Sequence, residues 1–317
     1  MARIRTLVAA VAAIATLALA DADPSVDVKP AAVYDGGVEG VENAPIKLRL
    51  GNGGAGESGL IEALANAFIR DSVAENGNSG HFRVAWYKSD TTFTIKHLGQ
   101  HLIDAGITYS AVAEDIAIDV GIAKAPAHYA FRDHFALVGP KDNPARLNGS
   151  ASVTGLFSKL YEAAEAQPEG RAAQIRFLSR FDKSATNLKE SHLWASVGQV
   201  PWADPVSGWY HKFQDYPLEA LRAAVHLGEY TVTDRGTLLS LEAGLRAELA
   251  VIKAGGDDDP EDPLLNPARL LIARNATNAA TADAFARWLV GERGQAVVEG
   301  FTSKTSGEKM YSRAPRS

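Results

Sequence analysis

The chain has 317 residues, of which 46% are hydrophobic and 22% are charged, so its composition is that of a globular protein rather than a disordered chain. Its formal charge of −6 argues against a general nucleic-acid-binding protein, which needs a basic surface. The absence of cysteine excludes disulfides, thiolate metal sites and cysteine nucleophiles.

The first 20 residues have the pattern of a secretory signal peptide. Two basic residues, Arg3 and Arg5, precede an apolar run over residues 7–19, and a small-x-small cleavage site ends at Ala20. The run is short for a membrane span, which makes an N-terminal anchor the weaker alternative. We therefore expect a secreted or periplasmic protein, cleaved near Ala20. Removal of the two arginines changes its formal charge from −6 to −8.

Residues 21–44 are rich in Asp, Pro and Gly and predict a loose lead-in. After this segment, strand and helix patterns alternate along the chain. The predicted strands cover residues 46–50, 82–86, 105–109, 135–138, 175–178, 230–233 and 270–273. The predicted helices cover residues 60–68, 94–102, 111–123, 153–166, 186–196, 217–227, 238–246 and 281–290. This alternation predicts an α/β fold with a mostly parallel sheet and helices on both faces.

A glycine-rich loop at 51–59, between a predicted strand and a helix, is the most distinctive segment. Such a loop presents backbone N–H groups and a positive helix end to an anion. A dinucleotide-binding fingerprint lacks its acidic residue at the usual distance, and Glu57 replaces the lysine of a P-loop. Gly56-Glu57-Ser58 resembles part of a hydrolase nucleophile elbow, with Ser58 as the nucleophile. A tight turn without a ligand is the remaining alternative.

Three further polar clusters, at 88–92, 182–187 and 231–237, follow predicted strands or precede predicted helices. Each alone is most simply a helix-capping segment. In open α/β sheets, however, ligands bind outside the carboxyl ends of the strands, where these segments would converge. Together they supply hydroxyl donors, helix N-termini and Arg235, a set that suits a small oxyanion.

Metal sites have weak support in the sequence. His97 and His101 lie four residues apart on a predicted helix, but no obvious third ligand accompanies them. The acidic segment 257–262 lacks the spacing of a calcium-binding loop. Trp194, Trp202 and the neighbouring aromatic residues are better explained by packing than by a sugar platform. We predict no metal and no cofactor.

Several segments together resemble a known family. They are Val-Gly-Pro-Lys-Asp-Asn-Pro at 138–144, Asp-Lys-Ser-Ala-Thr at 182–186 and Tyr-Thr-Val-Thr-Asp-Arg-Gly-Thr at 230–237. Over roughly residues 45–300, the chain resembles the tungstate-binding branch of the type II periplasmic substrate-binding proteins, which capture solutes for ABC importers. Its glycine-rich first loop is similar to that of secreted fungal members of this superfamily.

The resemblance implies a type II periplasmic-binding-protein fold, with two α/β lobes, a ligand cleft between them and two hinge strands. The first lobe would span 45–135 and 237–310, and the second 136–236. The family carries three threonines and a serine in the first loop, where this chain has Asn-Gly-Gly-Ala at 52–55. The family's oxyanion site maps onto Asn52, Gly53, Gly54, Ser58, Ser89, Thr91, Ser184, Thr186 and Arg235.

The resemblance further implies a non-catalytic, monomeric binding protein for tungstate or molybdate, with an ABC transporter permease as partner in a bacterial setting. Two alternatives stay open at this point. One is a secreted serine hydrolase that uses Ser58. The other is a secreted interaction module on the same fold that binds no small ligand.

Overall fold

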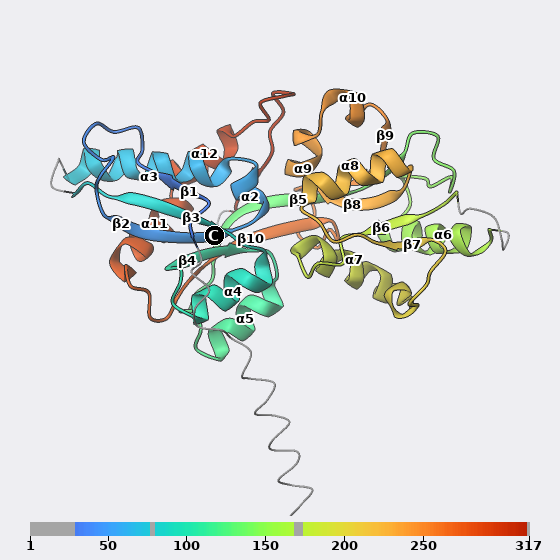
Figure 1. Cartoon of the computed structure of the whole chain (residues 1–317), viewed down its shortest axis with the longest axis horizontal. Coiled ribbons are helices and arrows are strands. Elements are labelled where there is room, and N and C mark those ends of the chain that lie inside the picture. Colours follow the sequence, from blue (N-terminus) through green and yellow to red (C-terminus); the bar gives the residue numbers. More distant parts are fainter. Residues whose placement is uncertain (1–28, 77–79, 168–173, 316–317) are drawn as a thin grey trace, which may run out of the picture.

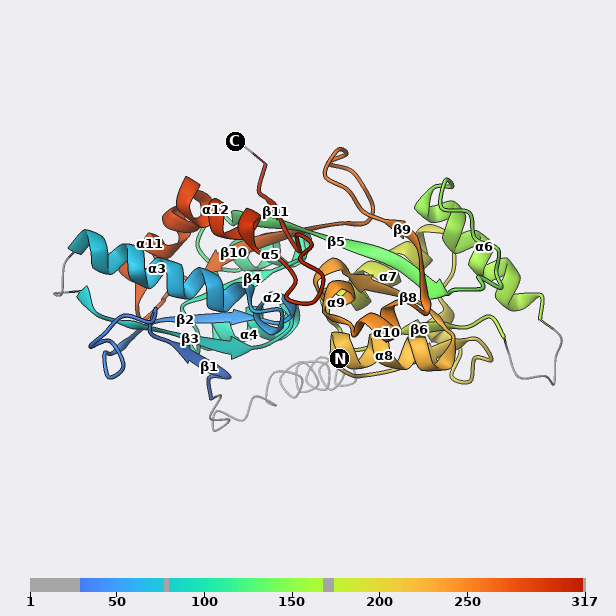
Figure 2. The ribbon, with the colours of Figure 1, turned by 90° about the horizontal axis from the view of Figure 1, so that it is seen from above.

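The computed structural model describes residues 29–76, 80–167 and 174–315. The predicted signal peptide and its cleavage site therefore lie outside the described residues. Figure 1 shows two α/β lobes side by side, with β5 (His128–Pro140) and β10 (Leu265–Ile272) at their junction. Figure 2 shows β5 running from one lobe into the other.

The first lobe is a sheet covered by helices on both faces. Its strand order is β1-β3-β2-β4-β10, with β1 at Ala32–Tyr34, β2 at Ile46–Asn52, β3 at Arg83–Lys88 and β4 at Ala105–Thr108. One face carries α3 (Leu60–Asn76), α11 (Ala279–Val290) and α12 (Glu292–Gly300). The opposite face carries α4 (Thr91–Gly99) and α5 (Ala111–Asp119). Figure 1 shows α3 and α4 on opposite sides of the sheet.

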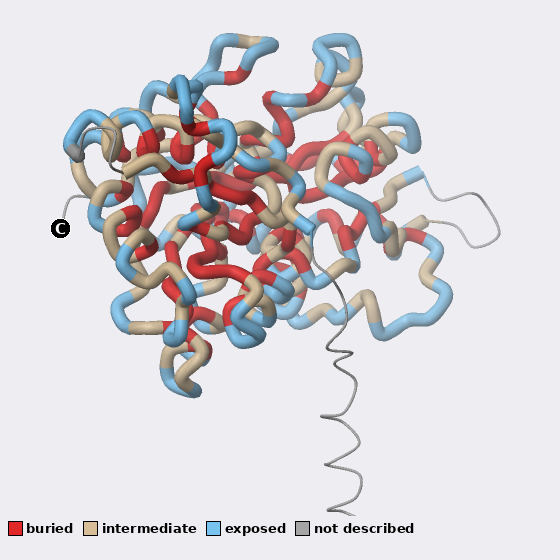
Figure 3. The backbone as a smooth tube through the Cα atoms, turned by 60° about the vertical axis from the view of Figure 1, so that its left-hand side comes forward, coloured by how far each residue is buried: buried red, intermediate tan, exposed pale blue. Residues whose placement is uncertain are grey.

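Strand β10 shows how the sequence builds these two layers. Leu270 and Ile272 are buried in the core beneath α3 and α11, whereas Leu271, between them, is buried beneath α4 and α5. Successive side chains of a strand point to opposite faces, so a continuous apolar run supplies both cores at once. Figure 3 shows buried residues along the interior of the molecule and exposed residues mainly on its outer loops and helices.

The second lobe is built around β5, β8 (Tyr230–Asp234), β6 (Phe177–Ser179) and β7 (Tyr210–Lys212), in that order. Its helices are α6 (Val153–Glu165), α7 (Ala185–Ser196) and α8 (Pro217–Leu227). Trp194 is fully buried, and its ring centroid lies 5.2 Å from that of Phe177 in an edge-to-face arrangement. Trp194 and Trp209 thus belong to the core, as predicted.

The remaining elements are short. A single turn, α2 (Gly54–Glu57), follows β2, and a 3₁₀ helix spans Pro201–Ala203. After β8 come α9 (Arg235–Ser240), α10 (Ala243–Arg246) and β9 (Leu249–Ala254), and β11 (Ser312–Arg313) pairs with β5 near the C-terminus.

Three sequence expectations need correction. The sheet is mixed rather than mostly parallel, because β5 leaves the first lobe and pairs antiparallel with β10, β8 and β9. Residues 32–34, expected in a loose lead-in, form β1 and pair with β3. The helix predicted over 238–246 is interrupted, because Leu241 is fully buried in an extended conformation between α9 and α10.

The exact boundaries of the lobes stay a prediction. Phe135, at the predicted end of the first lobe, packs in the second core, as does Leu264 from beyond the predicted end of the second lobe. In the part of the chain that the structure describes, no helix is both long enough and apolar enough to cross a membrane.

Candidate ligand cleft between the lobes

A cavity of about 540 Å³ lies between the two lobes. Its lining comes from the segments that follow β2, β3 and β4 in the first lobe, and from those that follow β6, β7 and β8 in the second. Phe135 of β5 and Asn266 of β10 contribute at the junction. The clusters of polar residues at the carboxyl ends of the strands therefore converge, as expected for an open α/β sheet.

Six of the nine predicted site residues line this cavity. They are Gly53, Gly54, Ser89, Thr91, Ser184 and Thr186. The other three, Asn52, Ser58 and Arg235, lie outside its lining.

The glycine-rich loop combines two roles. A β-carbon at Gly56 would lie 2.2 Å from the ring of Trp86, and one at Gly51 would lie 2.5 Å from Ile103. These two glycines are required by packing of the loop against the first lobe. Gly54, in contrast, has open space around it and borders the cavity together with Gly53. This middle part of the loop can therefore bring its backbone close to a ligand.

Asn52 holds the glycine-rich loop in place through its side-chain hydrogen bonds. It is fully buried, and its amide nitrogen donates to the carbonyl of Ile107 at 3.0 Å and to the hydroxyl of Tyr109 at 3.3 Å. Its side-chain oxygen accepts from the backbone N–H of Gly56 at 2.9 Å. These bonds occupy both ends of the amide, so Asn52 shapes the loop rather than facing the cavity.

Ser58 and Arg235, two of the predicted site residues, do not line the cavity. The hydroxyl of Ser58 donates to the carbonyl of Ala55 at 3.0 Å and lies 2.8 Å from the hydroxyl of Tyr311. Burial raises the pKa of Tyr311 well above its ordinary value, so this hydroxyl cannot serve as a base near neutral pH. Arg235 begins α9, and its charge acts on Asp133 and His134.

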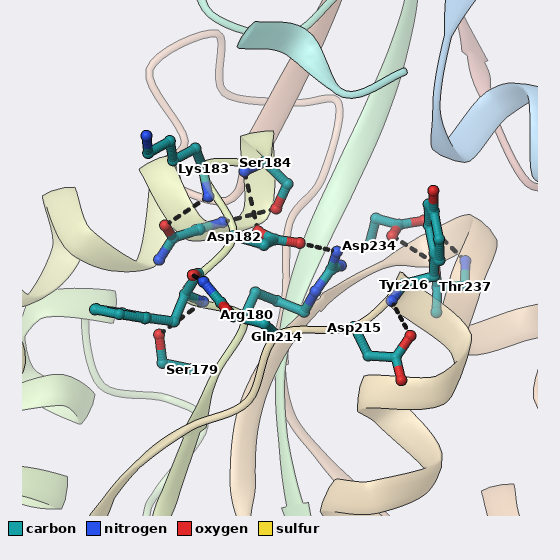
Figure 4. Close-up of polar contacts among 12 residues, drawn as sticks. Ser179, Arg180, Asp182, Lys183, Ser184, Gln214, Asp215, Tyr216, Asp234 and Thr237 are labelled. Carbon is teal, nitrogen blue, oxygen red and sulfur yellow. Dashed lines mark hydrogen bonds and ion pairs between the residues drawn. The ribbon is translucent and has the colours of Figure 1, made fainter. Parts of the chain in front are cut away.

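Arg180 lines the cavity but is not among the site residues predicted from the sequence. Its side chain is only 5% exposed, and it forms an ion pair with Asp182 through Nη2 (Figure 4). Its buried Nε–H has no hydrogen-bond partner among the described residues. A guanidinium that lines a cavity is suited to binding an anion. The signal in the sequence was its position just after β6 and before the Asp182–Thr186 cluster.

The N-terminus of α7 lies beside Arg180 at the same cavity. Ser184 is the N-cap residue, and its hydroxyl accepts from the backbone N–H of Asn187 at 3.3 Å. The first turn of a helix leaves backbone N–H groups without intrahelical acceptors, and here these belong to Ala185 and Thr186. Both residues line the cavity. The positive end of the α7 dipole therefore adds to the charge of Arg180.

Glu190, one turn further along α7, holds this end of the helix in place. It is fully buried and accepts hydrogen bonds from the hydroxyl of Ser179 and, at 2.8 Å, from the side-chain amide of Asn187. Burial raises the pKa of Glu190 to about 8. The side chain is therefore mostly protonated at neutral pH and adds little negative charge near the N-terminus of α7.

Two hydroxyls from the first lobe complete the polar lining. The Ser89 hydroxyl lies 2.7 Å from that of Thr94, and the Thr91 hydroxyl accepts from the backbone N–H of Tyr109 at 3.3 Å. Thr91 retains its own O–H for donation into the cleft, because the bond to Tyr109 uses only an oxygen lone pair.

The two lobes contact each other at the rim of the cavity. Lys88 of the first lobe lies 2.5 Å from Glu57, and its ammonium group is 3.3 Å from the ring centroid of Tyr216 in the second lobe. Nearby, the hydroxyl of Thr92 donates to the backbone carbonyl of Lys183 at 3.1 Å. From the sequence, Glu57 is expected to point away from an anion or to weaken its binding; in the structure it lines the cavity, paired with Lys88.

Two aspartic acid side chains, Asp133 and Asp234, also line the cavity. Asp133 is buried, and burial together with the neighbouring Asp234 raises its pKa well above the ordinary value. Asp234 itself caps α9 by accepting from the backbone N–H and the hydroxyl of Thr237. A protonated Asp133 can donate a hydrogen bond where an ionised carboxylate would repel an anion.

Metal binding finds no support in the described residues, where no group of three His, Cys, Asp or Glu side chains could hold an ion. His97 lines the cavity, and burial lowers its pKa, whereas His101 is exposed and lies outside the lining.

Known proteins with similar sequences and structures agree with this architecture. A crystal structure described as "a periplasmic putative metal binding protein" is 51% identical, with a TM-score of 0.80, and the match covers 90% of this chain and all of that one. The "Putative ABC transporter anion-binding protein" of Haloferax volcanii is 28% identical over 79% of this chain and 67% of its own length. The tungstate-binding protein TupA of Peptoclostridium acidaminophilum is 25% identical over 80% of this chain and 81% of its own length.

These relatives confirm the resemblance to tungstate-binding members of the periplasmic substrate-binding proteins, and the two-lobe α/β fold is confirmed as well. The family model of the PBP superfamily domain matches residues 42–293, which is most of the chain. The chain belongs to the PBP superfamily.

Proposed function

We propose that this protein is an exported, non-catalytic solute-binding protein that captures a small oxyanion, tungstate or molybdate first, in the cleft between its lobes. One observation carries the proposal: the nearly buried guanidinium of Arg180 lines the cavity beside the N-terminus of α7. The names of the relatives, an anion-binding protein and a tungstate-binding protein, support the same class of ligand.

Binding would depend on donors from both lobes. Arg180 supplies the positive charge, while Thr186 and the first N–H groups of α7 supply neutral donors. From the first lobe, Thr91 and the backbone of Gly54 face the same cavity. An anion held between these groups would draw the lobes together, which is the hinge closure expected of two α/β lobes joined by crossing strands.

Localisation and partners follow from this assignment. We propose a periplasmic or secreted location after cleavage near Ala20, and an ABC transporter permease as partner in a bacterial setting. We expect a monomer without nucleic-acid binding. The lobe boundaries at 135/136 and 236/237 belong to the same proposal.

The hydrolase alternative gains no support from the site. Ser58 lies outside the cavity lining, and in the described part of the chain its hydroxyl contacts only Ala55 and Tyr311. A serine nucleophile needs an adjacent general base, and neither contact provides one.

A thermal-shift screen tests the proposal directly. Purified mature protein would be melted with tungstate, molybdate, sulfate or phosphate. Because a ligand that binds only the folded state stabilises it, at a concentration of 100 Kd we expect a gain of about 2.7 kcal/mol and a clear rise in melting temperature. Melting temperatures unchanged by every oxyanion would contradict the proposal and favour the ligand-free interaction module.

A further inference from the structure

The cavity is larger than a bare oxyanion requires. A tetrahedral oxyanion takes up roughly the space of four water molecules, or about 120 Å³ at about 30 Å³ each. The cavity measures about 540 Å³. This volume coexists with contacts between the lobes, from Lys88 to Tyr216 and from Thr92 to Lys183. The spare room is therefore present while the lobes already touch.

Part of the cavity wall is apolar. Arg180, Ser184 and Thr186 are polar residues that the second lobe contributes to the lining. Apolar side chains from different elements line the same cavity, namely Phe93 of α4, Ile107 of β4, Phe135 of β5, and Tyr216 and Pro217 at the start of α8. Ligand sites commonly combine such apolar walls with a few placed polar groups, and a wall of this kind favours a ligand with an apolar part.

The charges of the lining favour a ligand of low negative charge. Besides Lys88 and Arg180, the lining contains the carboxyl groups of Glu57, Asp90, Asp133, Asp182, Asp215 and Asp234. Both cations are already paired, Lys88 with Glu57 and Arg180 with Asp182. Each additional negative charge on the ligand therefore adds repulsion from the ionised carboxylates of the lining.

We propose that the preferred ligands are organic oxyanions, namely sulfonates or singly ionised phosphonates whose tetrahedral head binds at Arg180 and α7. Their organic substituent packs against the apolar wall that includes Phe93. This inference rests on the oxyanion binding of the proposed function and adds the chemical class of the ligand. Burying a substituent of phenyl size contributes more than burying a methyl group, because the gain scales with the apolar area removed from water.

Isothermal titration calorimetry can test this class of ligand. The full mature protein would be titrated with tungstate, and with the methyl and phenyl members of both the sulfonates and the phosphonates. For at least one head group, we expect the phenyl compound to bind at least tenfold more tightly than the methyl compound. In Phe93→Ser we expect this ratio to fall at least threefold, while tungstate affinity stays the same.

A matched control is available on the surface. Phe93 is 47% exposed, so its replacement should leave the fold intact, and Val112→Ser on α5 changes a 72% exposed residue that does not line the cavity. Val112→Ser should leave every affinity unchanged. Phenyl compounds that bind no more tightly than methyl compounds would overturn the inference, whatever tungstate does. Absence of tungstate binding, with the phenyl preference present, would instead contradict only the choice of tungstate as ligand.

Discussion

At the residue scale, the ability of the cleft to bind a ligand depends on which polar groups already form hydrogen bonds within the protein. Asn52 and Ser58 are types of residue that bind anions, yet their hydrogen bonds are used within the first lobe. Arg180, in contrast, is nearly buried and lines the cavity. The sequence identified Ser184 and Thr186 because a capping pattern marks a helix start. It could not identify Arg180, because nothing in a local pattern says which arginine turns inward.

Glu190 gives a pH prediction at this scale. Its pKa in the folded protein is raised to about 8 from 4.5, so its contribution to stability is fully present below about pH 4.5 and is lost as the pH rises toward 8. Glu190→Gln mimics the protonated side chain and cannot titrate. We expect its melting temperature to fall less than that of the wild type between pH 4.5 and pH 8. If the melting temperatures of the two proteins changed equally between pH 4.5 and pH 8, the raised pKa of Glu190 would be contradicted.

At the scale of elements, the sequence predicted most strands and helices of both lobes, because their apolar periodicity is local. It missed β1, β7, β9 and β11. The strand character of β9 and β11 depends on pairing with the distant β5. It also missed the antiparallel pairs at the junction, since strand direction there follows from how the chain passes between the lobes. The elements were thus more predictable than their pairing.

The glycine-rich loop offers a paired prediction. In Gly56→Ala the new methyl group would lie 2.2 Å from the ring of Trp86, so we expect a loss of about 1–3 kcal/mol in the free energy of unfolding. In Gly54→Ala the methyl group meets open space, and we expect an unchanged or slightly higher stability. Urea denaturation would measure both variants. Equal stability of the two would show that the loop is not packed as described.

At the scale of the whole molecule, the net charge bears on how the proposed anion would be captured. The formal charge is −6, so the overall field of the protein does not attract anions. In the proposed function, capture would therefore depend on donors gathered locally between the two lobes, from the glycine-rich loop and from α7. The negative charge of the sequence already predicted that the overall field would not draw in an anion. The contact between Lys88 and Tyr216 across the lobes could be seen only in the structure.

That contact predicts how the lobes respond to mutation. A cation over an aromatic ring contributes about 0.5–1 kcal/mol at an exposed site, so Tyr216→Leu should lower the ratio of closed to open molecules by about two- to fivefold. Tyr216→Phe keeps the ring and should behave like the wild type. Small-angle X-ray scattering of the ligand-free proteins would report the change in compactness. Identical scattering of Tyr216→Leu and Tyr216→Phe would show that the contact does not hold the lobes together.

The central claim is that Arg180 binds an oxyanion in the cleft, and calorimetric titration of Arg180→Gln with tungstate tests it most directly. Arg287→Gln, on the exposed side of α11, removes the same charge outside the cavity lining and is the matched control. Since a hydrogen bond to a charged group contributes about 1.5–3 kcal/mol, Arg180→Gln should bind at least tenfold more weakly than the wild type, and Arg287→Gln should not. Equal affinities of all three proteins would contradict the claim.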